Sequence, residues 1–165
     1  MRSRSSVNRK IVSLEELAAE SRQLRSSGKR VVATNGCFDI LHVGHVRYLA
    51  AARKLGDILV VGLNGDSSVR QLKGEGRPVN REQDRAEVLA ALESVDYVTI
   101  FPELRAANFL QAAQPAIYAK GGDYTADTLN AAERAVLDKF GTKIEIIPFE
   151  KGYSTSQLLT RIGKA

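Results

Sequence analysis

The run DILVVGLN, residues 57–64, most constrains what this chain can fold into. It is almost continuously apolar and contains β-branched residues, which is typical of a strand that is covered on both faces. Four further strand-like runs alternate along the chain with segments of helical apolar spacing. Alternating strands and helices predict a parallel sheet with right-handed crossover connections. We therefore expect an α/β fold, a Rossmann-like doubly wound five-stranded parallel sheet with helices on both faces.

The expected elements follow from apolar spacing, glycine stops and capping residues. The strands are predicted over residues 29–34, 57–64, 96–100, 116–120 and 143–149. The helices are predicted over residues 13–28, 43–56, 80–92, 104–113 and 131–141, with a last short helix within 150–163. The pairs predicted to cap helices are Ser13 with Glu16, Asn80 with Gln83, and Asn130 with Glu133. Residues 65–80 are polar and contain several glycines, so we predict a loop there.

The composition suits an ordinary soluble domain. The chain has 165 residues, of which 44% are apolar and 26% charged. No apolar run approaches the roughly 18 residues that cross a membrane, so no membrane partner is expected. The first residues lack the apolar stretch of a secretory signal, and the single cysteine cannot form an internal disulfide. These features predict a cytoplasmic protein.

The net charge of +5 is concentrated at the N-terminus. Arg2, Arg4, Arg9 and Lys10 supply four of these charges, and the first ten residues contain no acid, so the rest of the chain is nearly balanced. We interpret residues 1–12 as a basic flexible tail and residues 13–165 as a single domain. A folded nucleic-acid binder carries its basic face on the domain itself, so no nucleic-acid partner is expected.

The loops at one edge of the predicted sheet hold most of the glycine. Ligands bind to such sheets at the carboxyl ends of the strands, where the strand order reverses. The loops expected there are residues 35–45, 64–80, 120–128 and 149–157. None contains G-x-G-x-x-G or G-x-x-x-x-G-K-[ST], so a hydride-transferring Rossmann enzyme or a P-loop kinase lacks its signature.

The stretch TNGCFDILHVGH, residues 34–45, contains both histidines and the only cysteine. His42 and His45 are three residues apart, so they share one face of the first turn of the predicted helix. Gly44 between them lets a phosphate or a base approach the backbone, and the amide groups at a helix N-terminus bind anions. Two imidazoles and backbone donors suit a phosphorus centre that gains negative charge as it is attacked.

Two other interpretations of this stretch remain open on the residues alone. The histidines could be packing residues. Cys37, Asp39, His42 and His45 could also form a zinc site, because all four have ligand-type side chains. Four ligands within nine residues of one strand-to-helix turn would be cramped, so we expect no metal site built from protein side chains.

Two motifs connect the chain with a family. GCFDILHVGH, followed late in the chain by GYSTSQLL, resembles the H-x-G-H nucleotidyltransferase superfamily, which contains the cytidylyltransferases and pantetheine-phosphate adenylyltransferase. The resemblance covers residues 13–163. Together with LKGEGRPVN, the AEVLAALESVDYV region and AKGGDY, the first motif resembles more narrowly the adenylyltransferases of ADP-heptose synthesis.

That resemblance implies an activity. These enzymes transfer AMP from ATP to a heptose 1-phosphate with Mg²⁺, giving ADP-heptose and pyrophosphate for lipopolysaccharide core or other surface glycans. In many bacteria the activity is one half of a bifunctional protein with a sugar kinase. Because this chain has no room for the kinase, we expect a stand-alone form, and the resemblance implies a homodimer.

The resemblance also implies roles for individual residues. The catalytic residues would be His42, His45 and Lys73. The nucleotide-binding residues would be Asn35, Gly36, Cys37, Phe38, Asp39, Gly44, Lys120, Gly121, Gly122, Asp123, Ser154, Thr155 and Ser156. The substrate-binding residues would be Asn64, Asp66, Arg77 and Arg85. Related cytidylyltransferases carry an arginine just before the serine–threonine segment, where this chain has Lys151. The sequence therefore leaves open which cation neutralises the leaving pyrophosphate.

Two alternatives to this function are retained. One is a cytidylyltransferase acting on glycerol phosphate or a similar alcohol phosphate, against which RPVN and KGGDY argue by resemblance. The other is a non-catalytic module that senses nucleotides or binds nucleic acid, against which the intact histidine pair argues.

Overall fold

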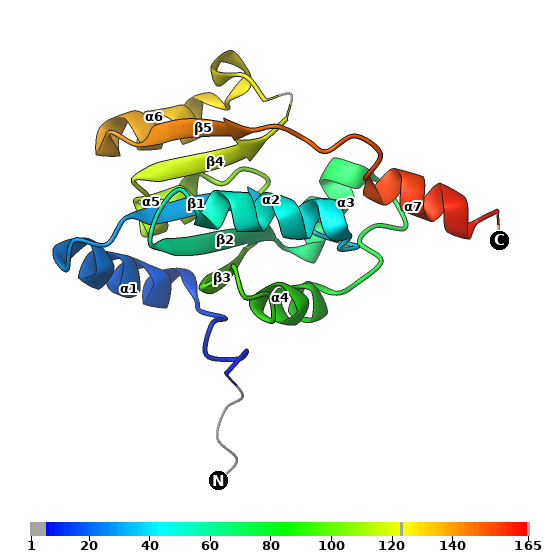
Figure 1. The fold of residues 1–165 in the computed structure, drawn as a ribbon, viewed down its shortest axis with the longest axis horizontal. Coiled ribbons are helices and arrows are strands. Elements are labelled where there is room, and N and C mark those ends of the chain that lie inside the picture. The colour runs from blue at the N-terminus through cyan, green and yellow to red at the C-terminus, as the bar shows by residue number, and fades with distance from the viewer. Residues whose placement is uncertain (1–5, 123, 165) are drawn as a thin grey trace, which may run out of the picture.

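The structure is a computed structural model that describes residues 6–122 and 124–164. Its centre is one parallel sheet with the strand order β3-β2-β1-β4-β5 (Figure 1). The strands are β1 (Val31–Gly36), β2 (Ile58–Asn64), β3 (Tyr97–Phe101), β4 (Ile117–Gly121) and β5 (Lys143–Ile147). The chain builds outward from β1 to β3, then returns to the other side of β1 with β4. The strand order therefore reverses between β1 and β4, which makes their carboxyl ends the expected binding edge.

Helices cover both faces of the sheet, as predicted. They are α1 (Leu14–Ser26), α2 (Val43–Arg53), α3 (Asp66–Lys73), α4 (Glu82–Ala90), α5 (Ala107–Ala113), α6 (Ala131–Phe140) and α7 (Thr155–Ile162), with a 3₁₀ turn, η1 (Ala126–Thr128). Leu49 of α2 and Leu89 of α4 pack on one face. Phe109 of α5 and Leu137 of α6 pack on the other, and Leu17 of α1 joins them. The fold predicted from the alternation of elements is confirmed.

Three local predictions need correction. Residues 66–73 form helix α3 rather than a loop, because Val69 and Ser68 are buried and the acidic and basic residues lie at the helix ends that favour them. Helix α4 is not capped by Asn80 with Gln83, as predicted. Its N-cap residue is Arg81, whose side chain makes no capping hydrogen bond. Glu133 accepts a hydrogen bond from the Ala106 amide (2.8 Å) instead of completing a capping box, although Asn130 does cap α6. The capping box of Ser13 and Glu16 is confirmed.

The expected N-terminal tail is partly docked on the domain. Ile11 forms an isolated parallel bridge with Val98 of the edge strand β3. Lys10 Nζ donates to the carbonyls of Leu92 (3.2 Å) and Val95 (2.7 Å), which follow helix α4. Lys10 and Ile11, both within the segment expected to be a tail, therefore contact the domain.

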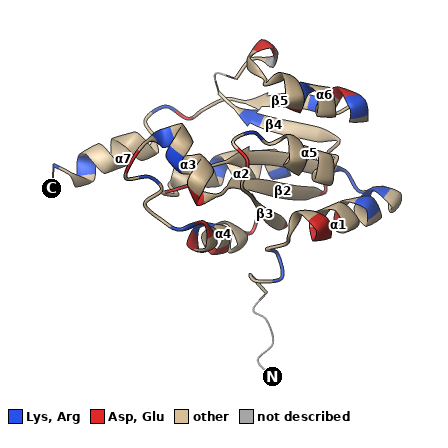
Figure 2. Cartoon of the chain, turned by 180° about the vertical axis from the view of Figure 1, so that it is seen from behind, with Lys and Arg blue, Asp and Glu red and all other residues tan. Residues whose placement is uncertain are grey.

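The charged residues are mixed along the helices. Figure 2 shows acidic and basic residues side by side on α1, α4 and α6. This distribution agrees with the nearly balanced charge expected for the chain beyond its first ten residues. Within residues 6–122 and 124–164, no helix combines the length and apolar character that crossing a membrane requires.

Candidate active site

The two histidines cap helix α2 for each other. His42 is the N-cap residue, and its Nδ1 accepts a hydrogen bond from the Gly44 amide (3.1 Å). The His42 amide in turn donates to Nδ1 of His45 (3.3 Å). This reciprocal pattern is a capping box in which imidazoles take the places that Ser or Thr and Glu usually occupy. The ring centroids lie 3.9 Å apart, so the spacing of the two residues does bring both rings to one spot.

The capping bonds fix the tautomers of both rings. A neutral imidazole has one acceptor nitrogen and one donor nitrogen. Because each Nδ1 accepts from a backbone amide, each Nε2 carries the hydrogen. Burial lowers the pKa of His42, and burial together with the nearby His42 lowers the pKa of His45 to about 4. At neutral pH both rings are therefore uncharged hydrogen-bond donors through Nε2.

The bend that precedes the pair is held by Phe38. This residue has a positive φ of 44°, which is uncommon outside glycine, and its ring is almost fully buried. Its ring meets that of His45 edge-on at a centroid distance of 5.5 Å. A Cβ at Gly36 would lie 3.0 Å from the same ring, so glycine lets Phe38 fold back on the strand end. Phe38 and Gly36 thus shape the bend that supports the histidines.

Asp39 connects the bend with the loop before α4. Its carboxylate accepts from Arg77 Nε (2.7 Å) and from the amides of Val79 and Asn80 (both 2.9 Å). Burial by itself raises the pKa of Asp39, but these hydrogen bonds outweigh it and lower the pKa. The Asn80 side chain also donates to the Asp39 carbonyl (2.7 Å), which explains why Asn80 does not cap α4.

The zinc interpretation finds no support in this arrangement. The carboxylate of Asp39, one of its four candidate ligands, is occupied by Arg77 and two amides. Nδ1 of each histidine is occupied by a backbone amide. Within the described part of the chain, no three His, Cys, Asp or Glu side chains are grouped as metal ligands.

Arg85 lies beneath the site rather than in it. The residue is only 2% exposed, and its guanidinium joins three loops. Nη1 donates to the carbonyls of Cys37 (2.7 Å) and Asn64 (2.8 Å), and Nε to that of Asn80 (3.0 Å). Nη2 donates to the Asp66 carboxylate (2.7 Å). Arg85 thus binds the backbone of Asn64 and the side chain of Asp66, two other residues expected to contact substrate, and holds the segments that carry them.

A second polar cluster lies where the strand order reverses. Lys120 of β4 is 8% exposed, and its Nζ donates to Oδ1 of Asn35 (3.1 Å) at the end of β1 and to the Tyr118 hydroxyl (3.1 Å). The ring of Tyr124 lies 4.3 Å from the same Nζ. Burial lowers the pKa of Lys120 to about 8, partly offset by the carboxylate of Glu133. Asn35 and Lys120, both expected to bind nucleotide, are brought together.

An aromatic ring packs against the glycine pair at the end of β4 and leaves no room for a side chain there. Phe149, 66% exposed, lies over Gly121 and Gly122. A Cβ at Gly121 would come within 2.7 Å of the ring, and one at Gly122, where φ is 50°, would overlap it. Asp123, the last expected nucleotide contact of this loop, lies outside the described residues.

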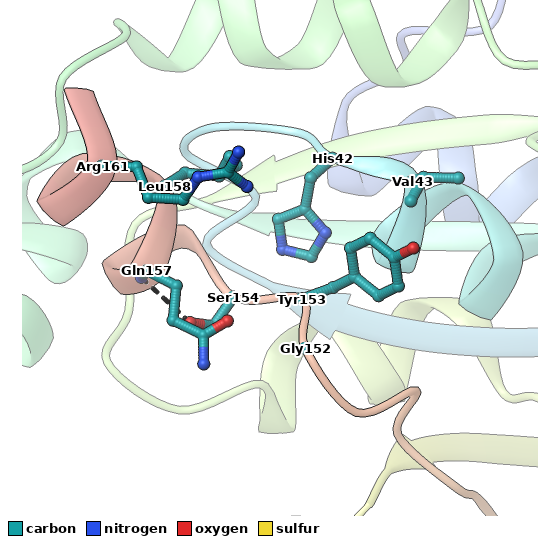
Figure 3. Close-up of a pocket in the computed structure, with 8 residues that line it drawn as sticks. All are labelled: His42, Val43, Gly152, Tyr153, Ser154, Gln157, Leu158 and Arg161. Atoms are coloured by element: carbon teal, nitrogen blue, oxygen red, sulfur yellow. Dashed lines mark hydrogen bonds between the residues drawn. The ribbon is translucent and has the colours of Figure 1, made fainter. Parts of the chain in front are cut away.

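The serine–threonine segment opens helix α7 beside the histidines. Ser154 is the N-cap residue and accepts from the Gln157 amide (3.1 Å). Thr155 Oγ1 donates to the Ile40 carbonyl (3.3 Å), which joins α7 to the bend before α2. A cavity of about 270 Å³ separates the two elements (Figure 3). It is lined by His42, Tyr153, Ser154, Gln157, Leu158 and Arg161, among others.

Tyr153 and Arg161 were not anticipated from the sequence. The Tyr153 ring stacks near His42, with centroids 6.4 Å apart, and Arg161 lines the same cavity. Helical spacing could have indicated Arg161 as a site residue, because it lies on the same face of α7 as Ser154 and Gln157.

The remaining predicted residues lie at the rim. Lys73, in the last turn of α3, and Ser156 are exposed. The positive charge of Lys73 acts on the stretch of residues 34–45. Burial raises the pKa of the Cys37 thiol, and the charge of Lys73 opposes that rise. Lys73 therefore faces the same loop but does not contact the histidine pair.

These features define a class of protein. A doubly wound sheet with two donor imidazoles at a helix N-terminus, beside its strand-order reversal, is suited to bind a nucleotide and to stabilise charge on its phosphate. The chain belongs to the cytidylyltransferase-like family, whose family model matches residues 33–161. This membership confirms the superfamily resemblance drawn from GCFDILHVGH and GYSTSQLL.

Curated relatives narrow the comparison. The chain is 47% identical over 156 residues to the bifunctional protein HldE of Geobacter sulfurreducens, covering 94% of this chain. It is 48% identical over 159 residues to HldE of Campylobacter fetus, covering 96% of this chain. The chain spans only 31% and 32% of the lengths of these two relatives.

Solved structures give the same picture. The lipopolysaccharide core biosynthesis protein from Thermoplasma volcanium is 31% identical, with a TM-score of 0.62, and the match covers 77% of this chain and 100% of that one. A pantoate-beta-alanine ligase from Francisella tularensis is 15% identical with a TM-score of 0.58, covering 94% of this chain and 78% of the ligase. The second likeness shows the fold alone.

The half-buried pair predicts an acidic titration that NMR can follow, since the chain has only two histidines. We expect both imidazole signals to titrate below pH 6.5, and that of His45 near pH 4. An unfolded histidine has a pKa of about 6.5, so the unfolded state binds more protons between these values. The free energy of unfolding should therefore fall as the pH drops from about 6.5 toward 4.

The variant His45→Gln tests the assignment of this pH dependence. Urea unfolding at about pH 7.5 and about pH 5 should show a smaller difference in the variant than in the wild type. A wild-type His45 signal that titrates at pH 6.5 or above would contradict a histidine pair that is uncharged at neutral pH.

Removing the Arg85 guanidinium should loosen three loops at once. Arg85→Met leaves the carbonyls of Cys37, Asn64 and Asn80 without their donor, so we expect a loss of at least about 1.5–3 kcal/mol in the free energy of unfolding. Chemical denaturation measures this loss. Arg70→Met, an exposed cation on α3, is the control and should change stability by less than about 0.5 kcal/mol. Equal stability of the two variants would contradict the role assigned to Arg85.

Proposed function

We propose that the chain transfers AMP from ATP to a heptose 1-phosphate, giving ADP-heptose and pyrophosphate for lipopolysaccharide core or other surface glycans. The observation that carries the proposal is the capped histidine pair, whose two rings lie 3.9 Å apart beside the site where the strand order reverses. The likeness to HldE proteins and to a lipopolysaccharide core biosynthesis protein supports the choice of acceptor.

In the proposed reaction, an anomeric phosphate oxygen attacks the α-phosphorus of ATP in line. This oxygen is already ionised at neutral pH, so no general base is required. Negative charge grows on the α-phosphoryl oxygens, and the Nε2–H groups of His42 and His45 stabilise it by hydrogen bonding. Catalysis then consists mainly of positioning and electrostatic stabilisation.

The surrounding residues would hold the two ends of the nucleotide. Lys120 and Asn35 lie where the strand order reverses and would face the nucleoside, with Gly121 beside them. The first turn of α7, with Ser154 and Thr155, would face the β- and γ-phosphates. Lys73, at the rim, would reach the phosphate of the acceptor.

Mg²⁺ would enter with ATP, held mainly by phosphate oxygens. Magnesium sites of this kind use few protein ligands, and the described residues group no three metal-ligating side chains. The bound ion would neutralise phosphate charge. We also propose a cytoplasmic location and a homodimeric assembly; the first rests on the single cysteine and the use of ATP, the second on the family resemblance.

Pyrophosphate release tests the proposed substrates. ATP, CTP, GTP and UTP should each be offered with heptose 1-phosphate, other sugar 1-phosphates, glycerol phosphate or no acceptor. We expect rapid release only from ATP with heptose 1-phosphate. Preference for CTP with glycerol phosphate would favour the cytidylyltransferase alternative. Tight, salt-sensitive RNA binding without pyrophosphate release would favour a non-catalytic module.

Loss of either imidazole should impair turnover. His42→Ala and His45→Ala each remove one donor to the α-phosphate, so we expect kcat to fall about 10²–10³-fold. Because each ring also caps α2, a stability loss of about 1 kcal/mol should accompany the change. Assays well below the unfolding temperature, with circular dichroism as a check of folding, separate the two effects. Near-normal turnover in both variants would refute the assignment.

A further inference from the structure

The cavity between α2 and α7 contains a cation that no role described so far uses. Arg161 lies in the last turn of α7, and Figure 3 shows its guanidinium group on the side of the cavity that faces His42. Side chains of a helix tilt toward its N-terminus, so Arg161 extends back along α7 toward Ser154. One continuous hollow thus joins a donor imidazole, the first turn of α7 and a guanidinium group.

The charges around this cavity favour an anion. None of its lining residues is acidic. Glu150, the acid nearest in sequence to the start of α7, pairs with Arg47. Within residues 6–122 and 124–164, Arg161 forms no ion pair. A guanidinium group that no carboxylate neutralises, in a cavity beside a catalytic imidazole, is suited to a phosphate ligand.

We propose that Arg161 binds the β- and γ-phosphates of ATP and then the leaving pyrophosphate. The inference rests on the proposed function, in which the α-phosphate lies at His42 and His45. In an in-line displacement the leaving group departs on the side opposite the attacking oxygen. The cavity adjoins His42 directly, so the phosphates bonded to the α-phosphate extend into it. Lys151, the cation suggested by its sequence position, does not line the cavity.

Binding of inorganic pyrophosphate and of AMP tests this assignment, because only the first ligand occupies the cavity. Isothermal titration calorimetry with Mg²⁺ should show pyrophosphate affinity about tenfold weaker in Arg161→Gln, while AMP affinity is unchanged. Arg161→Lys should give an intermediate loss, because lysine keeps the charge without the planar fork. Lys164→Gln removes one charge just beyond α7, outside the cavity lining, and should leave both affinities unchanged.

Steady-state kinetics give a second readout. In Arg161→Gln the KM for ATP should rise and product inhibition by pyrophosphate should weaken, with the KM for the acceptor unchanged. Unchanged pyrophosphate affinity in Arg161→Gln, or an altered KM for the acceptor alone, would overturn the inference. Both ligands are tested without the acceptor. A chain that binds pyrophosphate through Arg161 but makes no ADP-heptose would therefore support this inference and contradict the proposed function.

Discussion

The buried guanidinium of Arg85 is the interaction on which the site depends. It donates to carbonyls of the loops that follow β1 and β2 and of the loop that precedes α4. Those carbonyls lie at or beyond the ends of strands, and a buried carbonyl without a donor is costly. The carboxylate of Asp39 completes the arrangement from the other side by accepting two amides of the same loop. One cation and one anion thus fix three irregular segments.

The histidine pair combines a structural and a chemical task in the same hydrogen bonds. By accepting backbone amides through Nδ1, His42 and His45 satisfy two donors that a helix N-terminus otherwise leaves unpaired. The same bonds hold each hydrogen on Nε2 and hold each ring in place. Gly44 makes this possible, because a Cβ there would lie 2.9 Å from the His42 ring. The donors are therefore organised before any ligand arrives, which is what electrostatic stabilisation of a reacting phosphate requires.

Helix α7 is attached differently from the rest of the fold. None of its residues is buried, whereas α2, α4, α5 and α6 each bury apolar side chains against the sheet. Its connection to the bend is the hydrogen bond from Thr155 to Ile40, with the ion pair of Arg47 and Glu150 nearby. Few buried contacts mean a low local stability, so α7 is the part of the site that is least fixed by the core.

The sequence by itself determined the layers of the fold and the place of the histidine pair. Apolar periodicity is a local property, and the H-x-G-H spacing sets both rings on one helical turn whatever surrounds them. Helix α3 escaped prediction because it is only 8 residues long and mostly polar, and because Gly65 and Gly74 flank it. The sequence also left undecided whether the candidate site residues touch a ligand or one another.

Only the tertiary structure decided which of these residues touch one another. Arg85 lies 21 and 19 residues after Asn64 and Asp66 and meets both beneath the site, whereas Arg161 of helix α7 faces His42 of helix α2 across a cavity. The sequence does not distinguish a polar side chain at a sheet edge that faces a ligand from one that supports a loop. Whether each one faces a ligand or supports a loop depends on which carbonyls and carboxylates the fold places within hydrogen-bond distance, and those partners lie in distant segments.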